Sequence, residues 1–232
     1  MKKVLLCLAL LSLSALPLMA NSLIQIGNPP DSGSGNCFPF GCAYNAEYQQ
    51  VYGASDFSSI QSPIQIMSLE LYNTQYNSGA TQTDAGTFTI TLSYTTKGIN
   101  DLDPTFANNF GNNPTQVFSG SINQAWNFPG TLHISFTTPF TYDPTQGNLL
   151  IDVVGTNVST PGGSIYYDVN STGGYFTRLY CPGGLSCSTG TVQTGYGWVT
   201  GLDYTSVPEP GTLVMLGTGL LGVVGVIRRR IL

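Results

Sequence analysis

The feature that most constrains the fold is a two-residue alternation of apolar and polar side chains between turn signals. The clearest case is the run GTFTITLSY at residues 86–94, in which four apolar residues alternate with threonine and serine. Successive side chains of a strand point to opposite faces, so this run predicts a strand with one buried and one neutral polar face. Residues 132–136, LHISF, repeat the pattern.

Further strands are expected along the chain, separated by turn signals such as Pro161-Gly162-Gly163. They lie at residues 23–26, 63–71, 149–154, 164–169, 175–180 and 196–204. Between residues 63 and 71 the alternation changes phase, which predicts a β-bulge. No segment before residue 207 keeps a helical period over three turns.

This pattern predicts an all-β fold, an antiparallel β-sandwich of jelly-roll type. Residues 137–143 and 148–153 resemble a hairpin that lies near the end of many extracellular jelly-roll modules. That resemblance favours a jelly roll over a closed barrel.

The N-terminus has the composition of a secretory signal peptide. Two lysines at positions 2 and 3 precede an apolar run over residues 4–16, and Ala20 offers a small residue for cleavage. Residues 1–20 are therefore expected to be removed on export. Cys7 lies inside the apolar run, so no lipid attachment is expected there. A buried N-terminal helix is the alternative.

The C-terminal segment, Val207–Leu232, has three parts. Pro208-Glu209-Pro210 is stiff and non-helical, Leu213–Ile227 carries no charge, and Arg228, Arg229 and Arg230 follow. As a helix, residues 210–227 would reach about 27 Å, close to the hydrocarbon thickness of a bilayer. This predicts a transmembrane helix whose arginines stay cytoplasmic, with the preceding chain outside. A buried core helix with a basic end is the alternative.

The order Val-Pro-Glu-Pro-Gly, a glycine-rich apolar span and a terminal Arg-Arg-Arg resembles a PEP-CTERM sorting signal. The resemblance implies recognition of Pro208, Glu209 and Pro210 by an exosortase-type membrane protease. It also implies transient membrane anchoring, then a final location at the cell surface or in the extracellular matrix. The chain thus divides into a signal peptide (1–20), a β-sandwich domain (21–206) and a sorting signal (207–232).

Charged residues make up only 8% of the chain. Between the two terminal segments eleven acids face two bases, Lys97 and Arg178, which gives a formal net charge of −9. Two bases cannot supply the phosphate contacts that drive nucleic-acid binding, so nucleic acid is excluded as a partner.

The domain contains four cysteines, Cys37, Cys42, Cys181 and Cys187. An even number in an exported protein favours disulfides, and three pairings are possible. We favour Cys37–Cys42 and Cys181–Cys187 because sequence neighbours meet most often. A four-thiolate zinc site is the rival interpretation.

The inventory of catalytic residues is small. The only histidine, His133, alternates out of phase with Leu132 and Ile134 and is expected to point outward, and no Gly-x-Ser-x-Gly motif accompanies it. Asp101 and Asp103 form a weak calcium candidate that does not fit an EF-hand. We therefore expect no cofactor and no enzyme activity, and place a hydrolase third among the possible functions.

Aromatic residues are abundant, with 13 Tyr, 11 Phe and 2 Trp. Sugars present apolar faces that exposed rings can cover, so Tyr166, Tyr167, Trp126 and Trp198 are candidate stacking residues. Core packing is the ordinary role of any one of them. The leading interpretation is a non-enzymatic surface or matrix domain, and a carbohydrate-binding module for an extracellular polysaccharide is the alternative.

Overall fold

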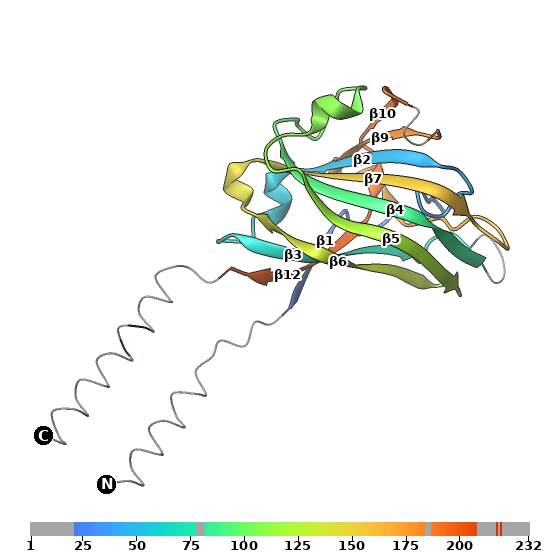
Figure 1. Cartoon of the computed structure of the whole chain (residues 1–232), viewed down its shortest axis with the longest axis horizontal. Helices are drawn as coiled ribbons and strands as arrows, with labels where there is room; N and C mark the ends of the chain where they lie inside the picture. The colour runs from blue at the N-terminus through green and yellow to red at the C-terminus, as the bar shows by residue number, and fades with distance from the viewer. Residues whose placement is uncertain (1–20, 78–81, 184–186, 208–216, 218, 220–232) are drawn as a thin grey trace, which may run out of the picture. The chain divides into compact units, whose positions relative to one another are not determined.

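Strands in antiparallel sheets dominate the part of the chain that the structure, a computed structural model, describes: residues 21–77, 82–183, 187–207, 217 and 219 (Figure 1). A compact unit spans Asn21–Thr205. The predicted signal peptide, the Pro208–Pro210 element and the three terminal arginines lie outside the described residues. Within the described ranges, no helix combines the length and the apolar character that a membrane span requires.

The strands form two main sheets and one small one. The four-stranded sheet has the order β1 (Ser22–Ile26), β12 (Thr200–Ser206), β3 (Ile64–Asn73), β6 (Gly130–Tyr142). The six-stranded sheet has the order β10 (Thr191–Thr194), β9 (Phe176–Cys181), β2 (Ala46–Tyr52), β7 (Asn148–Ser159), β4 (Gln82–Thr95), β5 (Thr115–Trp126). A two-stranded ladder joins β11 (Gly197–Trp198) to β8 (Val169–Asn170). Three short 3₁₀ helices lie between strands: η1 (Ala54–Phe57), η2 (Phe106–Asn109) and η3 (Pro144–Gln146).

One hydrophobic core joins the two main sheets, which form separate layers in Figure 1. Ile66 and Leu71 of β3 and Phe88 and Ile90 of β4 are fully buried in the same cluster. The apolar members of the alternation in residues 86–94 and 132–136 therefore face or pack against the core, and of the polar members Ser93 is buried as well. An arrangement of two sheets around a shared core agrees with a sandwich.

The predicted change of phase in β3 is a β-bulge. The register against β6 shifts between Ile66 and Ser68, so the buried set passes from Ile64 and Ile66 to Leu69 and Leu71. At this irregularity residues 136–139 of β6 stand against Met67 alone, and beyond it Glu70 lies on the face opposite the core, where it pairs across the ladder with His133.

Two strand predictions were wrong. Residues 137–143 and 148–153 do not form a hairpin, because β6 pairs with β3 whereas β7 pairs with β2 and β4 in the other sheet. The η3 turn carries the chain from one layer to the other. Residues 164–168 form no strand, since only an isolated bridge from Tyr167 to Asn36 precedes β8.

Both cysteine pairings are confirmed. Cys37 bonds Cys42 with a Cα–Cα distance of 5.0 Å, and Cys181 bonds Cys187 with a Cα–Cα distance of 6.4 Å. Both distances suit disulfides. The four-thiolate zinc alternative is therefore wrong.

Candidate functional site

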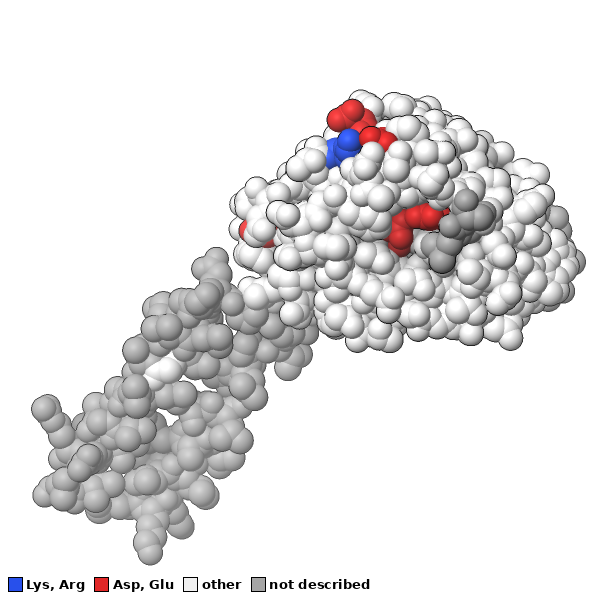
Figure 2. Space-filling view, turned by 45° about the horizontal axis from the view of Figure 1, so that its top comes forward, with Lys and Arg blue, Asp and Glu red and all other residues white. Residues whose placement is uncertain are grey.

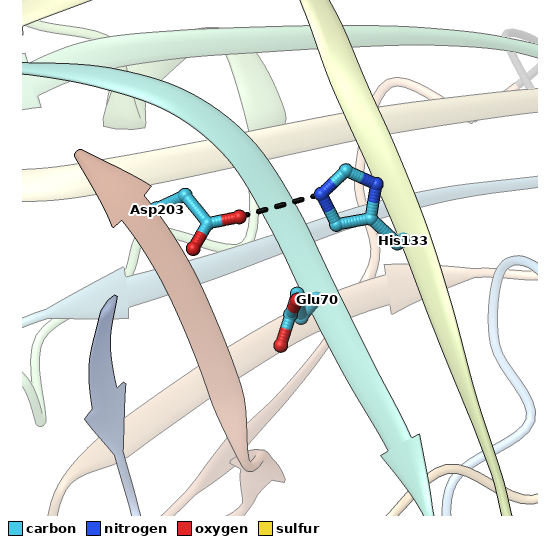
Figure 3. Close-up of side chains that lie close together, drawn as sticks. All are labelled: Glu70, His133 and Asp203. Atoms are coloured by element: carbon cyan, nitrogen blue, oxygen red, sulfur yellow. Dashed lines mark hydrogen bonds and ion pairs between the residues drawn. The ribbon is translucent and has the colours of Figure 1, made fainter. Parts of the chain in front are cut away.

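Three ionisable side chains meet on the outer face of the four-stranded sheet: Glu70 from β3, His133 from β6 and Asp203 from β12 (Figure 3). Their nearest ligand atoms all lie within 4.8 Å of one another. Glu70 and His133 are direct cross-strand partners, and β12 lies beside β3 on its other side. The cluster therefore follows from strand register rather than from a sequence motif.

His133 points outward as its position in the alternation predicted. Leu132 and Ile134 on either side are buried, whereas the His133 side chain is 45% exposed. Its Nε2 lies 3.3 Å from Oδ2 of Asp203, whose side chain is 25% exposed. Solvent thus reaches the imidazole from the face opposite the core.

Two hydroxyl groups on the same strand, β3, donate hydrogen bonds to the carboxylates. Ser68, 3% exposed, donates its hydroxyl hydrogen to Oδ2 of Asp203 at 2.5 Å, and Tyr72 donates to Oε2 of Glu70 at 2.8 Å. Burial, followed by the hydrogen bond to Glu70, raises the pKa of Tyr72, so its phenol remains a donor. Each carboxylate therefore has a fixed hydrogen-bond donor.

Gly201, which has no side chain, leaves the space that the Tyr72 phenol occupies. A Cβ at residue 201 would collide with the Tyr72 hydroxyl and approach Cβ of Glu70 to 3.1 Å. The absent side chain on β12 lets Tyr72 lie across the neighbouring strand and reach Glu70.

The cluster is not a serine-hydrolase triad. In such a triad an accessible serine donates to histidine, and the carboxylate holds the far side of the ring. Here Ser68 is buried and donates to Asp203, the same carboxylate oxygen that faces His133. The serine and the histidine thus compete for one acceptor instead of forming a relay.

The cluster is acidic and has no basic partner. Among the described residues no lysine or arginine pairs with these carboxylates, and the contact of His133 with Asp203 is an ion pair only when the imidazole is protonated. Arg178 binds the Gln193 side chain with Nε and Nη2, and the charge of Lys97 acts on Asp103. Figure 2 shows one face of the domain to be almost uncharged, with carboxylates in a few separate groups.

Three of the four proposed sugar-stacking residues are core residues, which is a correction. Trp126, Tyr167 and Trp198 are at most 3% exposed, and the Trp198 ring stacks on Tyr48 with centroids 4.0 Å apart. Their large apolar area fills the core, so none presents a ring face to solvent. Tyr166 is partly exposed and packs edge-on against Tyr76.

Other rings form a row around Tyr180 of β9, the strand next to the edge strand β10, and we call it the aromatic row. Phe38 stacks between Tyr44 and Tyr180, with centroid distances of 6.0 Å and 5.5 Å. The Arg178 guanidinium lies 4.5 Å from the Tyr180 centroid and 4.2 Å from that of Tyr196. Tyr44, at one end, is 58% exposed. Sequence reasoning missed this row, because distant segments contribute its members.

The calcium candidate stays a prediction without support. Asp103 accepts hydrogen bonds from the Thr105 backbone at 2.8 Å and from the Asn108 amide at 3.2 Å, and these bonds lower the pKa of its carboxyl. No third His, Cys, Asp or Glu of the described chain joins Asp103 and Asp101 in a possible metal cluster. The hydrogen bonds of Asp103 within the turn are enough to explain an aspartate at position 103.

The domain also buries carboxyl groups that sequence reasoning did not single out. Asp84 accepts the Tyr167 hydroxyl at 2.6 Å, and Asp152 accepts from the Gln49 amide at 3.0 Å. Burial raises the pKa of Asp84 and of Glu47 to about 7 and that of Asp152 to about 6, and the charge of Asp152 adds to the effect on Glu47. The ionisation of these groups therefore makes the stability of the domain depend on pH.

Comparison with known proteins identifies the C-terminal segment. Residues 206–230 match the family model described as the PEP-CTERM protein-sorting motif. No curated protein matches the chain. The crystal structure of the T13 IBDV viral particle aligns over 83% of this chain and 40% of the viral chain, at 10% identity and a TM-score of 0.25. This chain thus spans less than half of the viral chain, and so low a score carries no argument about fold.

Proposed function

We propose that the chain is an exported protein whose C-terminal signal passes it through the inner membrane to the cell surface or extracellular matrix, where its β-domain acts without catalysis. The observation that carries the proposal is the sorting-motif match at residues 206–230. In this proposal residues 1–20 are the signal peptide, and the C-terminal helix is a transient anchor with Arg228–Arg230 on the cytoplasmic side. An exosortase-type protease is the processing partner by resemblance.

We assign the domain to the jelly-roll type. Support comes from two sets of four neighbouring strands, β1-β12-β3-β6 in one sheet and β2-β7-β4-β5 in the other. β1, β3 and β6 lie in the first sheet, and β2, β4 and β7 lie in the second. The chain therefore crosses repeatedly from one sheet to the other, as in two interlocked Greek keys. In this assignment β9 and β10 extend the edge next to β2.

The site supports a non-enzymatic role. Ser68 is buried and bonded to Asp203, so it offers no nucleophile to the sole histidine. The Glu70–His133–Asp203 cluster lies on a sheet face and not among loops, where catalytic residues most often gather. The domain is better suited to binding or to a structural role.

The first prediction tests sorting through Glu209. In a host with an exosortase-type protease, Glu209→Gln should leave membrane insertion intact and block maturation, because it removes the recognised charge at nearly constant volume. Intact-mass analysis should find a longer, membrane-bound form of the variant. Asp143→Asn, which removes a carboxylate within the β-domain, should mature as the wild type does. Mature wild-type protein that still ends at Leu232 would sink the sorting proposal.

A second candidate function, carbohydrate binding, rests on the aromatic row. Phe38 and Tyr180 stack in a continuous series that ends at the exposed ring of Tyr44. Aromatic faces cover the apolar faces of sugars, and neighbouring amide and hydroxyl groups supply hydrogen bonds.

The second prediction tests this row on a glycan array with the full-length chain in detergent. Tyr44→Ala should raise the Kd for the bound glycan about tenfold, as expected for loss of one stacked ring. Tyr76→Ala is the matched control, since Tyr76 is 40% exposed but lies outside the row. Equal losses in both variants, or no glycan bound by the wild type, would reject the candidate.

A further inference from the structure

We propose that Glu70, His133 and Asp203 bind one divalent first-row transition-metal ion, with zinc the ion that suits the donor set best. The inference is independent of sorting, because it rests only on the outer face of the four-stranded sheet.

The donor atoms match what such an ion requires. Zinc takes imidazole nitrogen and carboxylate oxygen ligands, and its open sites use three protein ligands and leave a fourth position to water. At metal–ligand distances of about 2.0–2.1 Å, neighbouring ligand atoms of a tetrahedron lie about 3.3 Å apart. His133 Nε2 and Asp203 Oδ2 lie 3.3 Å apart. Side-chain rotation of Glu70 closes the larger separations, which do not exceed 4.8 Å.

Neighbouring hydroxyl groups hold two of the three donor residues in place. The buried Ser68 hydroxyl fixes Asp203, and the Tyr72 hydroxyl fixes Glu70. Hydrogen bonds of this kind orient metal-binding carboxylates and tune their affinity. The three ligands themselves come from adjacent strands, β12, β3 and β6, so the scaffold that spaces them is rigid.

Charge also favours a cation at this position. With a neutral imidazole the cluster carries two negative charges, and neither Lys97 nor Arg178 forms an ion pair with its carboxylates among the described residues. A divalent ion would neutralise both carboxylates. The exposed imidazole edge of His133 gives it a path from solvent.

Imidazole as a ligand separates transition metals from calcium. Calcium takes oxygen ligands, six to eight of them, which this cluster does not provide. Imidazole suits zinc, copper, iron and nickel. Calcium is therefore the control ion.

The third prediction tests binding directly. The full-length chain, purified in detergent without a histidine tag and freed of metal with chelator, is titrated with zinc chloride in a calorimeter. We expect saturation at one ion per chain, and calcium chloride should bind at least tenfold more weakly. Since the chain has one histidine, its imidazole NMR signals report the site without assignment, and zinc should shift them.

Variants separate ligands from bystanders. His133→Ala and Asp203→Asn should each raise the Kd for zinc at least 100-fold. Tyr72→Phe should raise it about tenfold, as for loss of a hydrogen bond that orients a metal ligand. Asp101→Asn, an exposed acid on a loop, should leave the Kd unchanged. Thermal unfolding of each metal-free variant checks that it is folded.

Two results would overturn the proposal. One is a wild-type chain whose zinc Kd equals that of His133→Ala, which would place any binding elsewhere. The other is an imidazole signal that does not move at saturating zinc. Neither result bears on whether maturation depends on Glu209. Failure of the zinc proposal is therefore distinguishable from failure of the sorting proposal.

Discussion

At the scale of single residues, buried carboxyl groups set how stability depends on pH. Burial raises the pKa of Asp84 and Glu47 to about 7 and that of Asp152 to about 6. In the unfolded chain such groups titrate near pH 4. Between these values the folded state binds more protons than the unfolded state, so the free energy of unfolding falls as pH rises from about 4 to about 7.

The fourth prediction follows for Asp84, whose side chain is fully buried. The domain should be more stable at pH 5 than at pH 8 in urea unfolding. Asp84→Asn should reduce that difference by about 2 kcal/mol, because it removes a buried charge and keeps an acceptor for the Tyr167 hydroxyl. Asp101→Asn is the exposed control and should leave the difference unchanged. A domain that gains stability toward pH 8 would contradict the assignment.

The candidate metal site shows what alternation reveals of single residues. Glu70 lies between Leu69 and Leu71, and Asp203 follows Leu202, so alternation alone turns both outward, as it did His133. The alternation does not show that the three side chains lie close together. Their meeting depends on the pairing of Glu70 with His133 and on the place of β12 beside β3, which are properties of the sheet.

At the scale of elements, β4 and β6 were predicted because one face of each is polar. The strand β2 was missed because all seven of its residues are buried. The core covers one face, and a second cluster with Val51, Phe106 and Leu179 covers the other. The buried amides of β2 are paired within the protein: Gln49 donates to Asp152 at 3.0 Å, and Gln50 accepts from the Trp198 backbone at 2.8 Å. A strand buried on both faces shows no alternation.

The two disulfides differ in their surroundings. The loop closed by Cys37 and Cys42 holds the fully buried ring of Phe40, and the Gly41 carbonyl accepts from the Ile165 backbone at 2.9 Å. Cys181 ends β9, and both it and Cys187 are partly exposed. The first loop thus joins the core, whereas the second bond lies toward the sheet edge.

The fifth prediction compares the two bonds by urea unfolding without reductant. Replacing Cys181 and Cys187 by alanine should lower the free energy of unfolding by about 2 kcal/mol, the loop-entropy contribution for so short a loop. Replacing Cys37 and Cys42 should cost more, because Phe40 also loses its fixed position. The reverse order, or four free thiols in non-reduced native protein, would contradict the argument.

At the scale of the whole molecule, the sequence is informative about the C-terminal sorting segment, and the structure is informative about the sites of the β-domain. The sorting motif could be read from residues 207–232 because it acts as a short linear signal, and the family match covers the same segment. The domain carries no comparable signal. Its candidate sites are assembled from distant segments, such as Tyr44 with Tyr180, or Glu70 with Asp203. Only the folded topology brings such residues together.

The position of β12 has a mechanical consequence for as long as the proposed C-terminal anchor is in place. β12 ends at Ser206, directly before the sorting segment, and it is an inner strand between β1 and β3. Hydrogen bonds of a sheet run across its strands, so a pull along β12 loads the ladders on both sides at once, in shear. An edge strand would instead peel away one bond at a time. A force that pulls the domain away from its attachment would therefore act on β12 in shear, the direction in which the ladders resist separation best.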